Sequence, residues 1–341
     1  MEPRVGNALI LGFQGTDLPD WLVDFEDRFG LGGVILFDRD LTGQAELRNI
    51  ESKEQVRALC ERVHSLDSRP MVFVDQEGGR VTRLKVERGF EALPSAADFA
   101  AMDGASATAV VEASFREMAS LGIDFNLAPV IDLNLNPANP NIGALDRSFS
   151  ADPAEVRRCV ELCAQAARRV GLQLCLKHFP GLGAAKTDSH TDLTDITDTI
   201  DSVQLALFDE LCPGLPGSAI LLSHGFVRHW DPDWPVSLSA VAVDRVRKFN
   251  PDALILTDDL QMQGLLAFTS LIDGGLRAHR AGVDLLCVGN NLQAGAEESV
   301  LLAEALAQDA SQSEIGCERM TRSLARVQSR KDFAGRTLRG K

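Results

Sequence analysis

The sequence lacks several features that would assign it to a particular class of protein. No apolar run approaches the roughly 18 residues that a membrane-spanning helix needs. The first residues, Met1 to Gly6, show no signal-peptide pattern. The seven cysteines include no Cys-x-x-Cys pair, which argues against a disulfide framework or a zinc site. We therefore expect core thiols in a reducing compartment, a cytoplasmic location and no membrane partner.

Basic residues are also scarce. The chain has 34 Lys and Arg against 49 Asp and Glu, which gives a net charge of -15. Phosphate binding requires clustered cations, so nucleic acid is not expected as a partner. The 341 residues, 45% of them hydrophobic, are enough for one large core. No linker divides them, and we expect a single catalytic domain over 1–330 followed by a basic, frayed tail at 331–341.

What the sequence does contain is a series of eight short apolar runs alternating with mostly helical stretches. This count predicts a (β/α)8 barrel, an α/β fold of the TIM type, and the runs do not alternate with polar residues, as expected for strands covered on both faces. A doubly wound sheet is the alternative fold. The predicted strands are 5–12, 32–37, 70–74, 125–133, 172–176, 219–222, 253–256 and 284–288.

Polar residues follow most of these strands, and in a barrel all such strand ends meet on one face. A doubly wound sheet would not explain why so many strand ends have reactive groups. The densest stretch is 177–190, where a Lys-His pair and a Gly/Pro-rich loop precede Asp188 and His190. A carboxylate beside an imidazole suits proton transfer. The polar strand ends are Asp75, Arg147, Lys177-His178, His224, Asp258 and Asn290.

Four ordered motifs, spread over about residues 5–295, resemble glycoside hydrolase family 3. They are Asp75-Gln76-Glu77-Gly78-Gly79-Arg80-Val81, Lys177-His178-Phe179-Pro180-Gly181, Asp188-Ser189-His190 and Thr257-Asp258-Asp259-Leu260-x-Met262. The single-domain layout is similar to the bacterial β-N-acetylglucosaminidases of the NagZ type. The resemblance implies a (β/α)8 barrel that removes terminal β-linked N-acetylglucosamine with retention, through a covalent glycosyl-enzyme.

By the same resemblance, Asp258 is the nucleophile and His190, paired with Asp188, is the general acid/base. Such a reaction needs an anion on one side of the bond and a proton donor on the other. Neither a cofactor nor a metal is implied, and the protein is expected to be a monomer. The substrate is expected to be a peptidoglycan fragment, with chitin oligomers left open. The residues that match sugar-holding positions are Asp75, Arg83, Arg147, Lys177 and His178.

Other polar residues near the motifs are expected to have structural roles. We expect Asp259 to be structural and Glu77 to brace the Asp75 loop, whereas His224 either binds substrate or forms a hydrogen bond inside the barrel. Leu182 stands where the family usually has His, so the loop's substrate contacts are expected to differ.

Three rival functions remain open at this point. The protein could be a phosphorylase, since a His acid/base repels phosphate less than a carboxylate does. It could be a metal-dependent hydrolase, although Lys177 beside His178 argues against convergent ligands. It could also be a sugar-binding protein without activity, although both Asp258 and His190 are present.

Overall fold

The computed structural model describes residues 4–41, 47–185, 193–292 and 296–339, with side chains described as far as 334. These residues contain an eight-stranded parallel sheet in the order β7-β6-β5-β4-β3-β2-β1-β8. A parallel bridge between Leu256 and Leu285 joins the two ends, so the sheet closes into the predicted (β/α)8 barrel. The strands are β1 Leu9–Leu11, β2 Gly33–Leu36, β3 Met71–Val74, β4 Phe125–Asn126, β5 Gln173–Phe179, β6 Ala219–Leu222, β7 Leu254–Thr257 and β8 Leu286–Val288.

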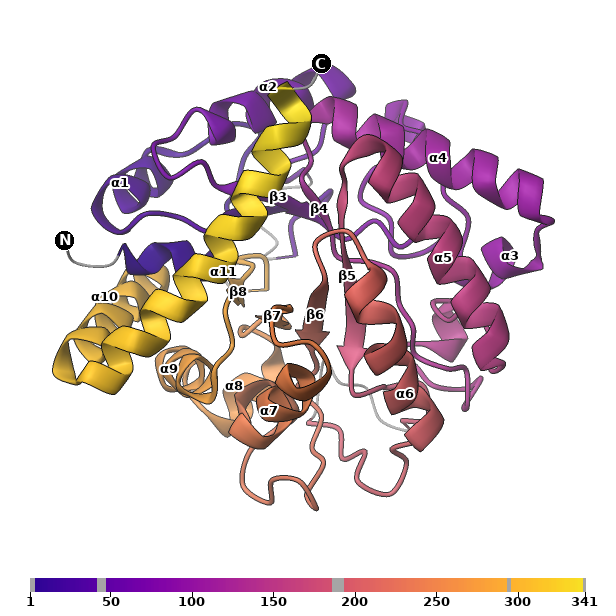
Figure 1. Cartoon of the computed structure of the whole chain (residues 1–341). Helices are drawn as coiled ribbons and strands as arrows, with labels where there is room; N and C mark the ends of the chain where they lie inside the picture. Colours follow the sequence, from indigo (N-terminus) through magenta and orange to yellow (C-terminus); the bar gives the residue numbers. More distant parts are fainter. Residues whose placement is uncertain (1–3, 42–46, 186–192, 293–295, 340–341) are drawn as a thin grey trace.

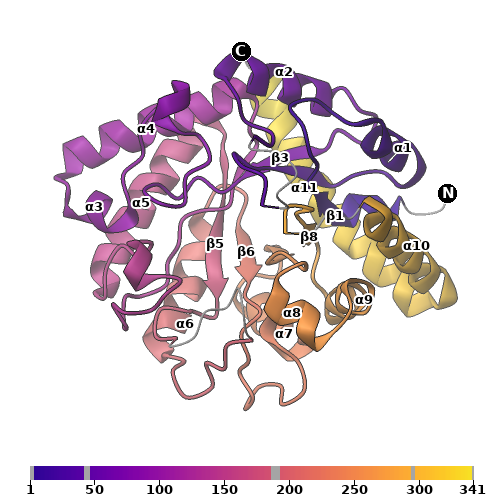
Figure 2. The same cartoon turned by 180° about the vertical axis from the view of Figure 1, so that it is seen from behind.

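Helices surround this sheet on its outer side (Figures 1 and 2). Seen from behind, α3, α4 and α5 lie on one flank and α9 and α10 on the other (Figure 2). The helices are α1 Asp20–Phe29, α2 Lys53–His64, α3 Ala96–Ala101, α4 Gly104–Leu121, α5 Pro153–Val170, α6 Ser202–Leu211, α7 Ala240–Phe249, α8 Gln263–Phe268, α9 Leu271–Ala281, α10 Ala296–Gln312 and α11 Glu314–Arg339. No helix among these described residues is long and apolar enough to cross a bilayer.

The strands are buried on both faces, which explains their continuous Val, Ile and Leu runs. Successive side chains of a strand point to opposite sides. Thus Ile10 of β1 belongs to the cluster inside the barrel, whereas Leu9 and Leu11 pack outward against the helices. Phe73 and Phe125 stack inside the barrel with ring centroids 5.1 Å apart. The two apolar layers together form the core.

Both ends of α5 have capping residues. The Asp152 side chain accepts a hydrogen bond from the N–H of Ala154, Pro153 occupies the first turn, and Gly171 ends the helix with φ of 73°. Glycine adopts this left-handed conformation without steric cost. Asp, Pro and Gly are typical residues at these positions, so the ends of α5 follow from its local sequence.

Three strands differ from their predicted bounds by three or more residues at one end. Residues 5–8 form a 3₁₀ turn, which packs so closely that a Cβ on Gly6 would lie 2.1 Å from the carbonyl oxygen of Gly30. The regular part of β4 ends at Asn126, ahead of Pro129, which has no N–H to donate to a neighbouring strand. In contrast, β5 continues through Lys177 and His178 to Phe179, whose carbonyl accepts from the N–H of Ser223 at 3.0 Å.

The helix α11 crosses the end of the barrel where the strands begin, in front of them in Figure 1 and behind them in Figure 2. Val327 joins the cluster inside the barrel. The helix continues to Arg339, into the segment 331–341 that the sequence predicted to be a frayed tail, and Lys331 is buried there. Its Nζ donates to Leu31 O and Ser68 O, at 2.7 and 2.8 Å, in the segments that precede β2 and β3.

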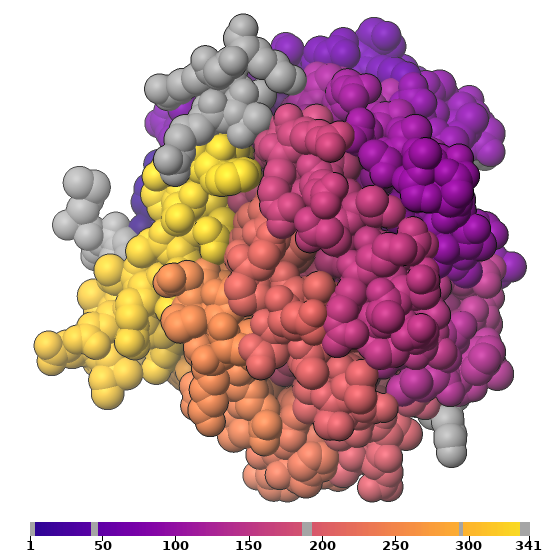
Figure 3. Space-filling view, turned by 45° about the vertical axis from the view of Figure 1, so that its right-hand side comes forward, coloured from indigo at the N-terminus to yellow at the C-terminus, as the bar shows by residue number. Residues whose placement is uncertain are grey.

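The surface view shows α11, in yellow, lying against the coral and orange surface of the later part of the chain (Figure 3). This is consistent with the hydrogen bond from Arg330 Nη2 to Asp252 O, at 2.7 Å, just before β7. One end of the barrel is thus covered by α11. The division into a domain at 1–330 and a separate tail stays a prediction.

Candidate active site

A cavity of about 460 Å³ opens at the other end, where the strands finish. Six of the predicted site residues line it, although they come from three strand ends, those of β3, β5 and β7, and from the loops after β3 and β4. The strand ends therefore converge on one face, as the sequence predicted. Asp188 and His190 lie outside the described residues. The six lining residues are Asp75, Arg83, Arg147, Lys177, His178 and Asp258.

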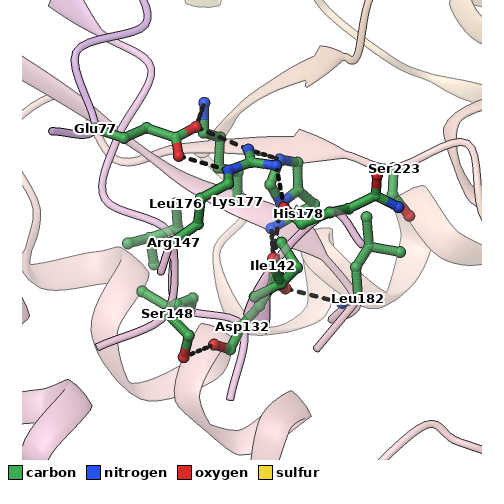
Figure 4. Close-up of polar contacts among 12 residues, drawn as sticks. Glu77, Asp132, Ile142, Arg147, Ser148, Leu176, Lys177, His178, Leu182 and Ser223 are labelled. Atoms are coloured by element: carbon green, nitrogen blue, oxygen red, sulfur yellow. Dashed lines mark hydrogen bonds and ion pairs between the residues drawn. The ribbon is translucent and has the colours of Figure 1, made fainter. Parts of the chain in front are cut away.

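Part of the cavity lining is a buried ionic cluster centred on Glu77. Figure 4 shows its contacts. Lys177 Nζ lies 2.6 Å from Asp75 Oδ1 and 2.6 Å from Glu77 Oε1. Arg147 donates to both oxygens of Glu77, from Nε at 2.7 Å and from Nη2 at 2.9 Å. Glu77 therefore braces the loop that contains Asp75, as expected from the sequence.

The charges in this cluster stabilise one another. Burial alone would raise the pKa of Glu77, but Arg147 and Lys177 outweigh it and hold that pKa well below its usual range. Burial would lower the pKa of Lys177, whereas Asp75 and Glu77 raise it. Both side chains are consequently charged at neutral pH, and their positions are fixed by charge-assisted hydrogen bonds.

His178 is oriented by a residue that the sequence analysis did not single out. Its Nδ1 lies 2.7 Å from Oδ2 of Asp132, which is fully buried (Figure 4). Its Nε2 lies 3.1 Å from Arg147 Nη2. Because a guanidinium can only donate, Nε2 accepts and Nδ1–H donates to Asp132. An aspartate within the apolar run 127–133 was the available signal for this role.

Asp132 also fixes the loop after β5. Its Oδ1 accepts from the N–H of Leu182 at 2.9 Å, and its own carbonyl accepts from Ser148 Oγ at 2.6 Å. Leu182 lines the cavity and is buried. This position therefore presents an apolar wall where the resembled family usually has an imidazole.

Asp258 follows β7, and its N–H donates to Leu222 O of the neighbouring strand at 3.1 Å. Burial would raise its pKa, but the imidazoles of His224 and His178, the N–H of Asp259 and the ammonium of Lys177 together lower it. The carboxylate is therefore ionised at neutral pH. A charged carboxylate held by a strand end inside a cavity has the properties of a nucleophile.

Asp259 has a different environment from its neighbour. Its Oδ1 accepts from the N–H groups of Gln261, at 3.0 Å, and Gly289, at 3.2 Å, so it ties the loop after β7 to the loop after β8. Burial raises its pKa to about 6. These contacts support the structural role expected for Asp259.

Of the two roles left open for His224, the structure shows the internal hydrogen bond. Nδ1 lies 2.7 Å from Ser237 Oγ and Nε2 lies 3.0 Å from the carbonyl oxygen of Asp259. Both ring nitrogens have partners and the side chain is buried. Burial lowers its pKa.

Arg83 reaches the cavity from the loop after β3. Its Nη1 lies 3.5 Å from Asp38 Oδ1, and its guanidinium lies over the ring of Phe37 at 5.5 Å. No group of three or more His, Cys, Asp or Glu side chains in the described part of the chain is arranged to hold a metal ion.

The family follows from a comparison with known sequences. The model of the "Glycosyl hydrolase family 3 N terminal domain" matches residues 25–330 of this chain. The chain belongs to glycosyl hydrolase family 3. The family resemblance drawn from the sequence motifs is thereby confirmed.

Individual relatives support the same assignment. The chain is 28% identical over 338 residues to Beta-hexosaminidase A of Pseudoalteromonas piscicida, covering 92% of this chain and 55% of the relative. It is 32% identical over 278 residues to Beta-hexosaminidase of Methylococcus capsulatus, covering 78% of this chain and 77% of that relative. The structure of a glycoside hydrolase family 3 beta-N-acetylglucosaminidase from Paenibacillus sp. str. FPU-7 matches with a TM-score of 0.86 and 27% identity, covering 98% of this chain and 62% of that one. This chain thus spans about half the length of the first of these relatives.

Proposed function

We propose that the protein is a retaining exo-β-N-acetylglucosaminidase. The observation that supports this most directly is the ionised Asp258 at the end of β7, in a cavity lined by Lys177, His178 and Arg147. These are the residue types that hold sugar hydroxyl groups beside a nucleophile. The names of the Paenibacillus and Methylococcus relatives support the sugar and the activity.

In the proposed reaction, an oxygen of Asp258 attacks the anomeric carbon, and the bond to the leaving oxygen breaks. His190, paired with Asp188, donates the proton that this oxygen takes up. His190 then removes a proton from water, which attacks the same carbon and releases Asp258. Two inversions at one carbon give overall retention. Asp75, Arg83, Arg147, Lys177 and His178 hold the sugar.

The proposal extends to the substrate and the compartment. We infer that the sugar is removed from peptidoglycan fragments in which N-acetylglucosamine is linked to a 1,6-anhydro-muramyl unit, as the family resemblance implies. Six of the seven cysteines are buried and all are free, which supports a reducing, cytoplasmic setting. The protein is proposed to act as a monomer.

The test of this function is activity on a panel of β-aryl glycosides, with the first-formed anomer followed by NMR. We expect release of 4-nitrophenol from the β-N-acetylglucosaminide and initial formation of the β-anomer. An initial α-anomer would contradict retention, and sugar 1-phosphate as the main product in phosphate buffer would replace hydrolysis by phosphorolysis.

The proposed role of His190 has its own test. His190→Ala should lose much more activity on substrates with poor leaving groups than on activated aryl glycosides, which need less protonation. His229→Ala is a suitable control, since His229 is exposed and lies outside the cavity lining. Equal losses on both substrate types in His190→Ala would exclude the acid role.

A further inference from the structure

Two arginines at the mouth of the cavity have no acidic partner among the described residues. Arg39 and Arg80 both line the cavity and are exposed. The other cations of the lining are paired: Arg83 with Asp38, Arg147 with Glu77, and Lys177 with Asp75 and Glu77. In a chain with a net charge of -15, two cations without a described carboxylate partner at this one opening call for an explanation.

The backbone that presents Arg39 is fixed by a residue from the far end of the chain. Asn291, which follows β8 and is buried, donates from Nδ2 to the carbonyl oxygen of Arg39 at 3.2 Å. The Oδ1 of the same side chain accepts from the N–H of Leu41 at 2.9 Å. One amide therefore clamps residues 39–41 at the rim, so Arg39 projects from a defined position.

Arg80 lies at the tip of a tight turn. Gly78 and Val81 exchange two backbone hydrogen bonds, each 3.2 Å long, around it. Gly78 has φ of 96°, and a Cβ on it would lie 1.9 Å from the carbonyl oxygen of Pro94. Only glycine fits this conformation and this close approach. The turn is thus packed against residue 94, and the position of Arg80 is also defined.

A terminal N-acetylglucosamine is neutral, so it gives these two cations nothing to neutralise. An exo-acting enzyme holds the terminal sugar inside and leaves the rest of the substrate at the mouth. We propose that Arg39 and Arg80 form a subsite for an oxyanion, a carboxylate or a phosphate, on the leaving-group side of the scissile bond. The exposed side chains of Leu41 and Leu292, which also line the mouth, provide apolar surface beside it. This inference rests on the proposed function.

The test compares two substrates whose leaving groups have similar acidity. They are the 4-nitrophenyl and the 3-carboxy-4-nitrophenyl β-N-acetylglucosaminides, which differ by one carboxylate. In the wild-type protein the ratio of kcat/KM values should favour the carboxylated substrate, and added salt should reduce this preference. Arg39→Gln and Arg80→Gln should each lower the ratio by roughly five-fold, the upper size of an exposed ion pair.

Arg57→Gln provides the matched control, since Arg57 is an exposed arginine on α2 that does not line the cavity. It should leave the ratio unchanged. The absence of turnover on both substrates in the wild type would defeat the proposed function itself. Normal turnover without a preference that depends on the arginines would overturn only the oxyanion subsite.

A second arm distinguishes the source of the oxyanion. Inorganic phosphate is added to reactions with the neutral substrate. If phosphate is the ligand, it should accelerate turnover, yield the sugar 1-phosphate, and lose this effect in Arg80→Gln. If the carboxylate belongs to the substrate, phosphate should only compete with the carboxylated glycoside. If neither the carboxylated substrate nor added phosphate shows an effect that depends on Arg39 and Arg80, the proposed subsite is refuted.

Discussion

Each end of the barrel buries a carboxylate between two cations, but the two clusters differ in what surrounds the cations. At the closed end, Asp284 pairs with Arg247 at 2.6 Å and with Arg326 of α11 at 3.1 Å. At the open end, Glu77 pairs with Arg147 and Lys177. The side chains of Arg247 and Arg326 are 17% and 26% exposed, whereas those of Arg147 and Lys177 are 10% and 3% exposed.

This difference in exposure explains why the pKa of Asp284 and the pKa of Glu77 shift in opposite directions. Burial raises the pKa of Asp284, and its partly hydrated cations do not compensate fully. The pKa of Glu77 is lowered despite its burial, because its cations are shielded from water and interact more strongly. The closed end attaches a helix, and the open end holds a set of fixed charges beside a cavity.

The largest effect expected at the open end is on the turnover rate and not on the stability of the fold. Asp258→Asn removes the proposed nucleophile, so kcat should fall by about four orders of magnitude or more. Asp258 is in no described salt bridge, so thermal stability should change little. Release of 4-nitrophenol and a thermal melt measure the two quantities. Residual activity near the wild-type level would place the nucleophile elsewhere.

The comparison itself is tested by one variant at each end. Glu77→Gln leaves two buried cations with reduced compensation, so it should lower the free energy of unfolding by about 3 kcal/mol. Asp284→Asn should lower it less, because burial disfavours the charge of Asp284 in the folded protein. Only Glu77→Gln should also impair turnover, since Lys177 and Arg147 lose their common partner. Denaturant titration and kcat/KM per folded molecule separate the two effects. Comparable losses of turnover would show that the two ends are not functionally distinct.

A smaller, pH-dependent effect is expected from the closed end. His279, near the end of α9, is buried. Burial lowers its pKa to about 4, with Arg319 contributing and Asp309 opposing. In the unfolded chain the imidazole takes up its proton near pH 6.5. Stability should therefore fall as pH drops from about 6.5 to 4, by up to about 3 kcal/mol.

Replacing His279 by Leu removes the titrating group. Unfolding measured at several pH values should show a flatter profile for His279→Leu than for the wild type, with its turnover at neutral pH retained. Parallel profiles for the two proteins would mean that another group is responsible for the acid sensitivity.

Much of the open end was predictable because strand ends can be located in a sequence. The apolar runs before Asp75, Lys177 and Asp258 determined that these residues would meet on one face. The grouping of Lys177 and His178 was less predictable, since neighbouring side chains of a strand normally point to opposite sides. Both line the cavity here, where the register of β5 against β6 shifts between Leu176 and Phe179.

By itself the sequence determined the barrel, the helix ends such as Asp152 and Gly171, and the acidic residue after β7. These depend on periodicity and on local backbone preferences, which a short window of residues contains. Only the tertiary structure decided that Asp132 orients His178 and that Asn291 clamps the backbone of Arg39. It also decided that α11 covers the end of the barrel where the strands begin. The partners in these contacts lie 46 to 300 residues apart in the chain, and only the folded barrel brings them together.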